Sequence, residues 1–475
     1  MTADGNSGQR GCPQCAEHKR RIADLEARLA QIEAELAKAR KHSGNSSKPP
    51  SSDIVRPPPK RAGKVGRPRR RKRGGQPGHP RHLRPLFGAE SVDRVIPYRY
   101  DACPCCGGRL QDAPQPPKVQ QHVELAPKLV VIEEHRRIAQ FCRRCQEVFY
   151  HPLGVALEKA GLCGPQLTAL VGFLKGPCHM SFSSIRKFFR DVMKVPISRG
   201  QLSKLVGKVS ASLQPAYADL LDRLPSEDCI NVDETGHKDS GKRLWTWCFR
   251  AALYTVFKVS PSRGSDVLLE VLGREFAGLL GCDYFSAYRK YARLNENVLL
   301  QFCLAHFIRD VKFLVEHPNP QNRSYGQRLL GHLKTLFATI HRREAFASDA
   351  TFRRSLERIE CDLVWDATAE SPHTKEARRL EERFYRHTES YFRFIVHPHI
   401  EPTNNLAEQV LRFVAIHRRI TQGTRGEAGQ RWWERMCTVI ATCAQQSRSV
   451  FHFLQEAVVQ HFAEKPPPLL SPAAS

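Results

Sequence analysis

The sequence predicts an α/β protein whose core is assembled from segments far apart in the chain. Two apolar, strand-like runs each lead into a carboxylate, Asp233 in "INVDETG" and Asp283 in "GLLGCDYF". A helical stretch rich in Arg, Glu and Leu then covers about 307 to 396, before a third acid, Glu408. With 475 residues and 41% hydrophobic composition, the chain can bury a core of ordinary size and divide into two or more domains.

Charge and composition narrow the class of partner. The net charge of +26 favours a polyanionic partner. No apolar run approaches the roughly 18 residues that a membrane span needs, and the start of the chain, "MTADGNSGQR", lacks the apolar stretch of a secretion signal. We therefore expect a cytoplasmic protein of bacterial type that binds nucleic acid and does not bind a membrane.

Residues 1–42 are predicted to form an amino-terminal coiled-coil helix. Apolar residues recur in it at steps of three and four, namely Ile22, Leu25, Leu29, Ile32 and Leu36. This seam is either a coiled coil of about two heptads, which supports a homo-oligomer, or the apolar face of a solvated amphipathic helix.

Residues 43–90 are predicted to be a disordered basic linker. Twelve Lys or Arg and no acid lie between Arg56 and Pro85, so no packed core can form there. The stretch "GRPRRR" supplies four of these cations, Arg67, Arg69, Arg70 and Arg71. It is either a hook for a narrow A·T minor groove or a basic tail that raises affinity for phosphates.

Residues 91–155 are predicted to be a zinc ribbon. Two C-x2-C pairs provide the ligands, Cys103 with Cys106 and Cys142 with Cys145. Four thiolates at this spacing predict one structural Zn²⁺, and the run between the pairs is strand-like. Cys105 falls outside the spacing. Cys12 and Cys15 have it but lack a second pair, so a site there would need His18 and another chain, and their role stays open.

Residues 156–224 are predicted to be a helical DNA-binding region. A Ser-capped amphipathic helix, a break at Pro196 and a second helix capped by Ser198 follow the order of a helix-turn-helix. In that arrangement Arg199, Gln201 and Lys204 face a groove of the DNA. The alternative is a plain helical bundle.

Residues 225–306 are predicted to be the first part of a ribonuclease-H-like catalytic core. Strands "RLWTWCFRA" and "YTVFKVS" follow the first acid, and a helix from about Ser265 precedes the second. Three antiparallel strands, a helix and more strands, with acids at the tips of the first and fourth strands, give this layout, in which the two tips are neighbours. Residues 307–398 are then a helical insertion, 399–460 the carboxy-terminal part of the core, and 461–475 a tail.

Three converging carboxylates predict a site for divalent cations. Glu408 lies one turn inside a helix that starts at "PTN", near enough to join Asp233 and Asp283. The three acids would repel one another unless cations lay among them. Hard oxygen ligands suit Mg²⁺ or Mn²⁺, and two such ions activate a water or a 3′-hydroxyl for in-line attack on a DNA phosphate. Because side chains alternate along a strand, Asp233 and Glu234 face opposite ways, and we expect Asp233 to be the ligand.

A series of motifs resembles the transposases of the insertion sequence 66 family, nearly from end to end. Besides the cysteine pairs they are "NSSKPPSSD" (45–53), "RGGQPGHP" (73–80), "VDETG" (232–236), "PSRGSDV" (261–267), "CDYFSAY" (282–288), "CLAH" (303–306), "PTNNLAEQVLR" (402–412) and "TRGEAGQR" (424–431). The resemblance implies a DDE transposase with Asp233, Asp283 and Glu408 as its catalytic triad. It also implies binding to the element's terminal inverted repeats and to target DNA, with small accessory proteins of the same element as further partners.

Other residues gain expected roles from the same resemblance. His306 in "CLAH" either orients the scissile phosphate or is structural, and the basic residues after the third acid hold DNA phosphates, namely Arg412, Arg418 and Arg419. His237 stands where the family often has Trp. Two rival functions are a DNA-binding regulator without catalysis and a nuclease or resolvase that does not join ends. The three acids favour an enzyme, because a regulator has no need of them.

Overall fold

The computed structural model describes residues 13–42, 44–45, 85–111, 114, 116–126, 128–397 and 399–471. These residues fall into two compact units. One contains the described residues of Met1–Pro58 and Arg137–Ser475, and the other those of Pro59–Arg136. Six residues named above lie outside the described part, namely Cys12, Arg56, Arg67, Arg69, Arg70 and Arg71.

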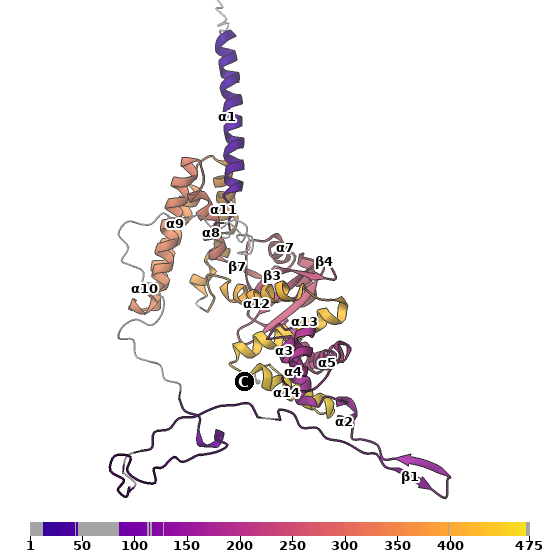
Figure 1. Ribbon diagram of the computed structural model, residues 1–475. Helices are drawn as coiled ribbons and strands as arrows, with labels where there is room; N and C mark the ends of the chain where they lie inside the picture. The colour runs from indigo at the N-terminus through magenta and orange to yellow at the C-terminus, as the bar shows by residue number, and fades with distance from the viewer. Residues whose placement is uncertain are drawn as a thin grey trace, which may run out of the picture. The chain divides into compact units, whose positions relative to one another are not determined.

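Before residue 155, the helices and strands in the described part of the chain are short, apart from the first helix. Helix α1 spans Pro13–Ala39, and a 3-10 turn, η2, spans Ala89–Ser91 in the smaller unit (Figure 1). Strands β1 (Ala139–Cys142) and β2 (Glu147–Tyr150) form an antiparallel hairpin. A strand-like run was expected between the two cysteine pairs, and the carboxyl end of that run forms strand β1.

A five-stranded mixed sheet forms the centre of the larger unit, which makes the protein α/β as predicted. Its order is β5-β4-β3-β6-β7. The strands are β3 (Cys229–Asp239), β4 (Lys242–Arg250), β5 (Thr255–Ser260), β6 (Leu279–Cys282) and β7 (Leu299–Phe302). Strands β3, β4 and β5 are antiparallel neighbours, whereas β6 and β7 run parallel to β3. Helices α6 (Ser265–Leu272) and α7 (Ser286–Leu294) connect the later strands.

The position of Asp233 corrects one expectation. Strand β3 does not end there but continues to Asp239, which pairs with Lys242 of β4. Ser240 and Gly241 both have positive φ and close a tight hairpin, so residues 235–239 stay in the ladder. The parallel pairing of β3 with β6 stops at Asn231 and Gly281. Asp233 therefore lies in mid-strand, just beyond the parallel part of the sheet.

Helices that come before and after the sheet in the sequence pack into the same core as the sheet. They are α2 (Val155–Ala160), α3 (Pro165–Lys175), α4 (Phe182–Asp191), α5 (Arg199–Arg223), with the turn η3 (Leu224–Ser226), and the carboxy-terminal α13 (Gly426–Gln445) and α14 (Val450–Phe462). Ser198 caps α5, because its hydroxyl accepts the N–H of Gln201. Tyr217 of α5 donates to the carbonyl of Phe257 in β5. The predicted break and caps are thus present, and this region packs in one core with the sheet.

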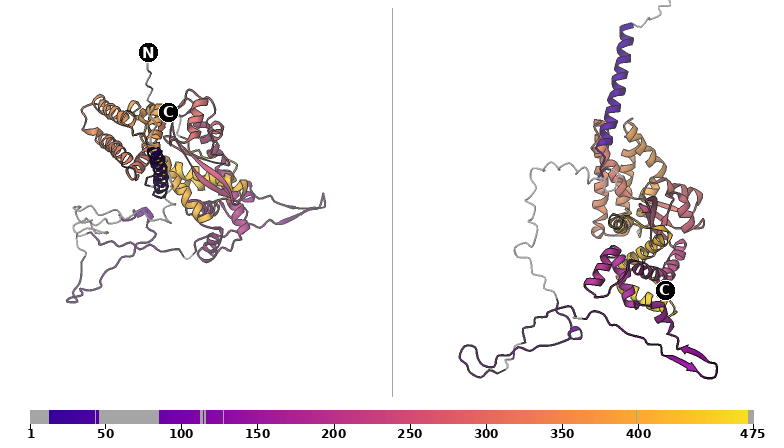
Figure 2. Two further views of the ribbon diagram at one scale, coloured as in Figure 1. Left: turned by 90° about the horizontal axis from the view of Figure 1, so that it is seen from above. Right: turned by 45° about the vertical axis from the view of Figure 1, so that its right-hand side comes forward.

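A helical insertion leaves the sheet after β7 and returns to it. It comprises α8 (Leu304–Val315), α9 (Pro320–Ile340), the turn η4 (Arg343–Ala345), α10 (Asp349–Thr368) and α11 (Lys375–Val396). Helices α9 and α10 lie side by side, and α11 packs on the edge strand β7 (Figures 1 and 2). Helix α12 (Asn405–Thr421) then crosses β3 and β4. No helix in the described ranges is long and apolar enough to span a membrane.

Candidate active site

Asn404 fixes the start of α12 to the sheet. Its buried side chain donates to the carbonyl of Val232 at 2.8 Å and accepts from the amide of Asn231 at 2.9 Å. Its backbone N–H donates to the sulfur of Cys303 at 3.1 Å. These bonds tie α12 to β3 and to the end of β7, so Glu408, one turn later, is held over the same end of the sheet. The sequence indicated Asn404 as part of a helix start, but not these contacts.

The structure places Asp233, Asp283 and Glu408 on three neighbouring elements. Asp233 lies opposite Cys248 of β4, which packs with Ala407 of α12, so Asp233 is on the α12 face of the sheet. Asp283 follows β6, and its carboxylate accepts the N–H of Phe285 at 2.8 Å. Burial raises the pKa of Asp233 well above its usual range, and the charges of Glu234, Asp283 and Glu408 raise it further. The carboxylates therefore act on one another across this site.

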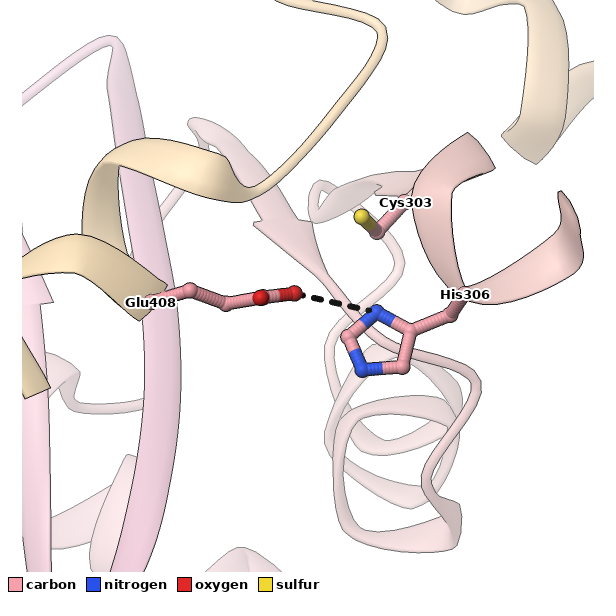
Figure 3. Close-up of side chains that lie close together, drawn as sticks. All are labelled: Cys303, His306 and Glu408. Atoms are coloured by element: carbon pink, nitrogen blue, oxygen red, sulfur yellow. Dashed lines mark ion pairs between the residues drawn. The ribbon is translucent and has the colours of Figure 1, made fainter. Parts of the chain in front are cut away.

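Glu408 is turned toward α8, and Figure 3 shows its carboxylate facing His306 of that helix. Its Oε1 lies 3.5 Å from Nδ1 of His306, and its Oε2 lies 3.1 Å from an Nη of Arg309. Burial lowers the pKa of His306, while Glu408 opposes that shift. Neither His306 Nδ1 nor Glu408 Oε1 has a hydrogen-bond partner, although both atoms are buried. Arg309 was not among the residues expected here.

Within the described part of the chain, one group of three donor residues has atoms within 4.8 Å of one another, namely Cys303, His306 and Glu408. The three acids are not such a group, because Glu408 faces α8. Cys303 is a poor partner for a hard cation: burial raises the pKa of its thiol to about 11, and its sulfur already accepts the N–H of Asn404. The carboxylate oxygens fit Mg²⁺ or Mn²⁺ better, because an unpaired buried oxygen and mutually repelling acids both call for positive charge.

Glu234 lies on the opposite face of β3 from Asp233, as alternation predicts, and is buried. Its Oε1 contacts two guanidinium nitrogens of Arg263, at 2.8 and 2.7 Å, and its Oε2 accepts a hydrogen bond from Tyr288. Burial and then Asp283 raise the pKa of Glu234 to about 7, against the opposing effect of Tyr288 and Arg263. Arg263 also stacks on Phe285, 4.1 Å from the ring centre. Since these partners are distant in sequence, no local pattern indicated them.

The "TRGEAGQR" segment is fastened to the far end of β3. His237 is buried; its Nε2 lies 2.9 Å from the hydroxyl of Thr424, which donates to Asp239 at 2.7 Å. Asp239 and Thr424 also form an isolated β-bridge. His237 therefore anchors the segment after α12 to the carboxyl end of β3.

Within the described part of the chain, the expected DNA-binding residues lie on two helices. Arg199 and Lys204 are exposed in the first turns of α5, and Arg412 and Arg419 are exposed on α12. Arg418 is half-buried, and a side chain in place of Gly236 would contact its guanidinium.

Each expected zinc-binding pair forms a tight turn. The Gly107 N–H donates to the carbonyl of Cys103, and the Gln146 N–H donates to that of Cys142. Backbone N–H groups of the following residues donate to the sulfurs of Cys103 and Cys142 and lower the pKa of both thiols. Such turns favour thiolates, the form that binds zinc. Cys103 and Cys106 belong to the smaller unit, and Cys142 and Cys145 to the larger one.

Comparison with known proteins gives three findings. The family model "Transposase IS66 family" matches residues 160–431, more than half of the chain. A "Family of unknown function (DUF6444)" matches residues 13–85. An uncharacterized protein of Sinorhizobium fredii, y4qI, is 22% identical over 293 residues, which are 56% of this chain and 54% of the relative. The chain thus spans about half the length of that curated relative.

Proposed function

The chain belongs to the IS66 family of transposases, and from this premise we propose that it binds the inverted-repeat ends of its insertion sequence and catalyses metal-dependent DNA cleavage and strand transfer. The observation that supports the proposal is the position of the three acids: Asp233 lies on β3 and Glu408 on α12, which packs on β3, while Asp283 directly follows β6, the neighbour of β3. The charges of Asp283 and Glu408 also contribute to the raised pKa of Asp233. The strand order, with β6 and β7 parallel to β3, supports a ribonuclease-H-like core. The helical insertion between Asp283 and Glu408 supports a DDE arrangement.

In this proposal Asp233, Asp283 and Glu408 hold Mg²⁺ or Mn²⁺, most simply two ions. Bound there, the cations stabilise the attacking and leaving oxygens of an in-line displacement. For cleavage, a water oxygen bonds to phosphorus, the P–O3′ bond breaks and the departing oxygen is protonated to a 3′-hydroxyl. For strand transfer, that hydroxyl attacks a target phosphate in the same way and releases a new 3′-hydroxyl.

The protein's own residues set the geometry for this step. Asn404 holds α12 against β3, and Glu234 with Arg263 and Tyr288 supports the strand beside Asp233. We propose that His306 and Arg309 position Glu408, and that His306 comes to face the scissile phosphate when the acid binds a cation.

Basic residues supply affinity for DNA. The net charge of +26 suits a polyanion. We propose that Arg412, Arg418 and Arg419 bind phosphates near the active site, that Arg199 and Lys204 bind DNA through α5, and that Arg67, Arg69, Arg70 and Arg71 add a basic arm. We further propose one structural Zn²⁺ held by Cys103, Cys106, Cys142 and Cys145. Because both ends of an element must be held together, the protein acts as a homo-oligomer, with accessory proteins of the element as further partners, in the bacterial nucleoid.

The test is cleavage and joining of DNA that carries the element's ends, in the presence of Mg²⁺. Wild-type protein is expected to cut and join, and Asp283→Asn to do neither. Glu401→Gln, which changes an exposed acid in the segment before α12, is the matched control and retains activity. Fully active Asp283→Asn protein contradicts the metal role. Cleavage without joining identifies a nuclease or resolvase, and binding without cleavage identifies a regulator.

A further inference from the structure

Helix α1 carries an apolar seam that the described structure leaves exposed. The five side chains of the seam, Ile22, Leu25, Leu29, Ile32 and Leu36, are 40 to 61% exposed. Their steps of three and four place them at positions a and d of successive heptads, with Ile22 at a. The helix lies in the part of the chain that matches a family of unknown function.

The charges beside this seam distinguish between possible partners. Arg21, Arg28 and Glu35 occupy g positions, and Glu26, Glu33 and Arg40 occupy e positions. In a parallel pair, each g residue lies beside the e residue five positions later on the partner helix. This gives Arg21 with Glu26, Arg28 with Glu33 and Glu35 with Arg40, so every pair has opposite charge.

An antiparallel pair fits this sequence less well. There g faces g and e faces e. The register that pairs Leu25 with Leu29 places Arg28 against Arg28 and Glu26 against Glu26, and the register that pairs Leu29 with Ile32 places Glu26 against Glu33. Like charges in such positions weaken the pair. A partner with an unrelated sequence would have no reason to match all three charge positions.

We propose that α1 pairs, parallel and in register, with α1 of a second copy of this chain. The pair is joined firmly to the catalytic unit, because Asn45, just after α1, is buried and donates to Glu316 beside α8 at 2.6 Å. Helix α8 carries His306 and Arg309, which contact Glu408. This pairing defines where two chains of the proposed homo-oligomer meet and that their α1 helices run in the same direction. It does not depend on the proposed catalytic chemistry.

The test uses the full-length chain without DNA, in sedimentation equilibrium at micromolar concentration. Wild-type protein is expected to form a dimer. The double variant Arg21→Glu/Arg28→Glu turns four attractive contacts per dimer into repulsive ones and should weaken the dimer on the order of 100-fold. Adding Glu26→Arg and Glu33→Arg restores opposite charges in a parallel pair, so the quadruple variant should recover the wild-type dissociation constant to within about threefold.

Matched controls make each outcome decisive. Arg20→Glu reverses a charge at an f position, away from the seam, and should leave the dimer unchanged. Circular dichroism of each variant checks that the fold is retained. A monomeric wild type, a trimer or tetramer, an unaffected double variant, or a quadruple variant that stays weak each overturns the proposal. Since no DNA is used, failure here is distinct from failure to cut DNA.

Discussion

Replacing Asn404 by Ala tests how the third acid is positioned. The side chain makes two buried hydrogen bonds, one to the carbonyl of Val232 and one with the amide of Asn231. Asn404→Ala leaves both partners without a substitute, because the site is shielded from water. A buried polar group left unpaired costs about 1–3 kcal/mol. We expect a loss of about 2–4 kcal/mol in the free energy of unfolding.

The neighbouring residue provides a matched control. Asn405 is exposed at the first position of α12, so Asn405→Ala should change stability by less than about 0.5 kcal/mol. The assay is the urea midpoint, followed by far-ultraviolet circular dichroism at constant pH. End cleavage at a temperature where both variants are folded should also fall in Asn404→Ala, because Glu408 is no longer held over β3. Equal midpoints for the two variants would refute this account of how α12 is held.

Three further predictions concern the buried histidines, the loop after α12 and the zinc ligands. Burial lowers the pKa of His237 to about 4 and of His417 to about 3, so both are neutral in the fold and gain protons on unfolding. The contribution of these neutral histidines to stability is complete above the unfolded pKa of about 6.5 and is lost as pH falls toward 4. His417→Gln should therefore reduce the loss of stability between pH 7.5 and pH 5 by about 2 kcal/mol, as measured by urea midpoints at the two pH values. The same change at an exposed histidine, His399→Gln, should leave this loss unaltered. Gly423 has φ +93, and a Cβ there would lie 2.0 Å from the carbonyl oxygen of Lys238. Gly423→Ala should therefore lower the free energy of unfolding by about 2–3 kcal/mol. Gly207 lies on α5 with open space around it, so Gly207→Ala should be neutral or stabilising in the same measurement. Cys103→Ser should abolish bound zinc by elemental analysis, and Cys105→Ser should retain it; zinc retained in Cys103→Ser would contradict the predicted ligand set.

Local patterns predicted the elements of the core well. Short apolar runs predicted the strand that contains Asp233 and the strand that ends just before Asp283. The helical stretch predicted for 307–396 is close to the observed α8–α11, which begins at Leu304. Ser198 was expected as a helix cap and is one. These features depend on residues close in sequence, which is why they can be inferred without a structure.

The prediction that the strand ends at Asp233 is wrong, because the turn that closes this hairpin lies further along the chain. Ser240-Gly241 is a two-residue turn with positive φ at both positions, and it extends the hairpin past Thr235. With that signal, the sequence predicts a long β3 and an acid in its middle.

The contacts around the acids could not be inferred from the sequence. Arg309 reaches Glu408 across 99 positions of the chain, and Asn404 reaches Val232 across 172. Pairings of this kind depend on how the insertion and α12 return to the sheet. A heptad or strand pattern carries no information about them.

The most direct test of the central claim is binding of Mn²⁺ to the protein without DNA, followed by electron paramagnetic resonance, in which zinc is silent. We expect wild-type protein and Glu401→Gln to bind Mn²⁺, and binding by Asp233→Asn, Asp283→Asn and Glu408→Gln to be at least about tenfold weaker. Affinity should rise with pH, because the raised pKa of Asp233 makes a proton compete with the cation. Unchanged Mn²⁺ binding in all three acid variants would contradict the account.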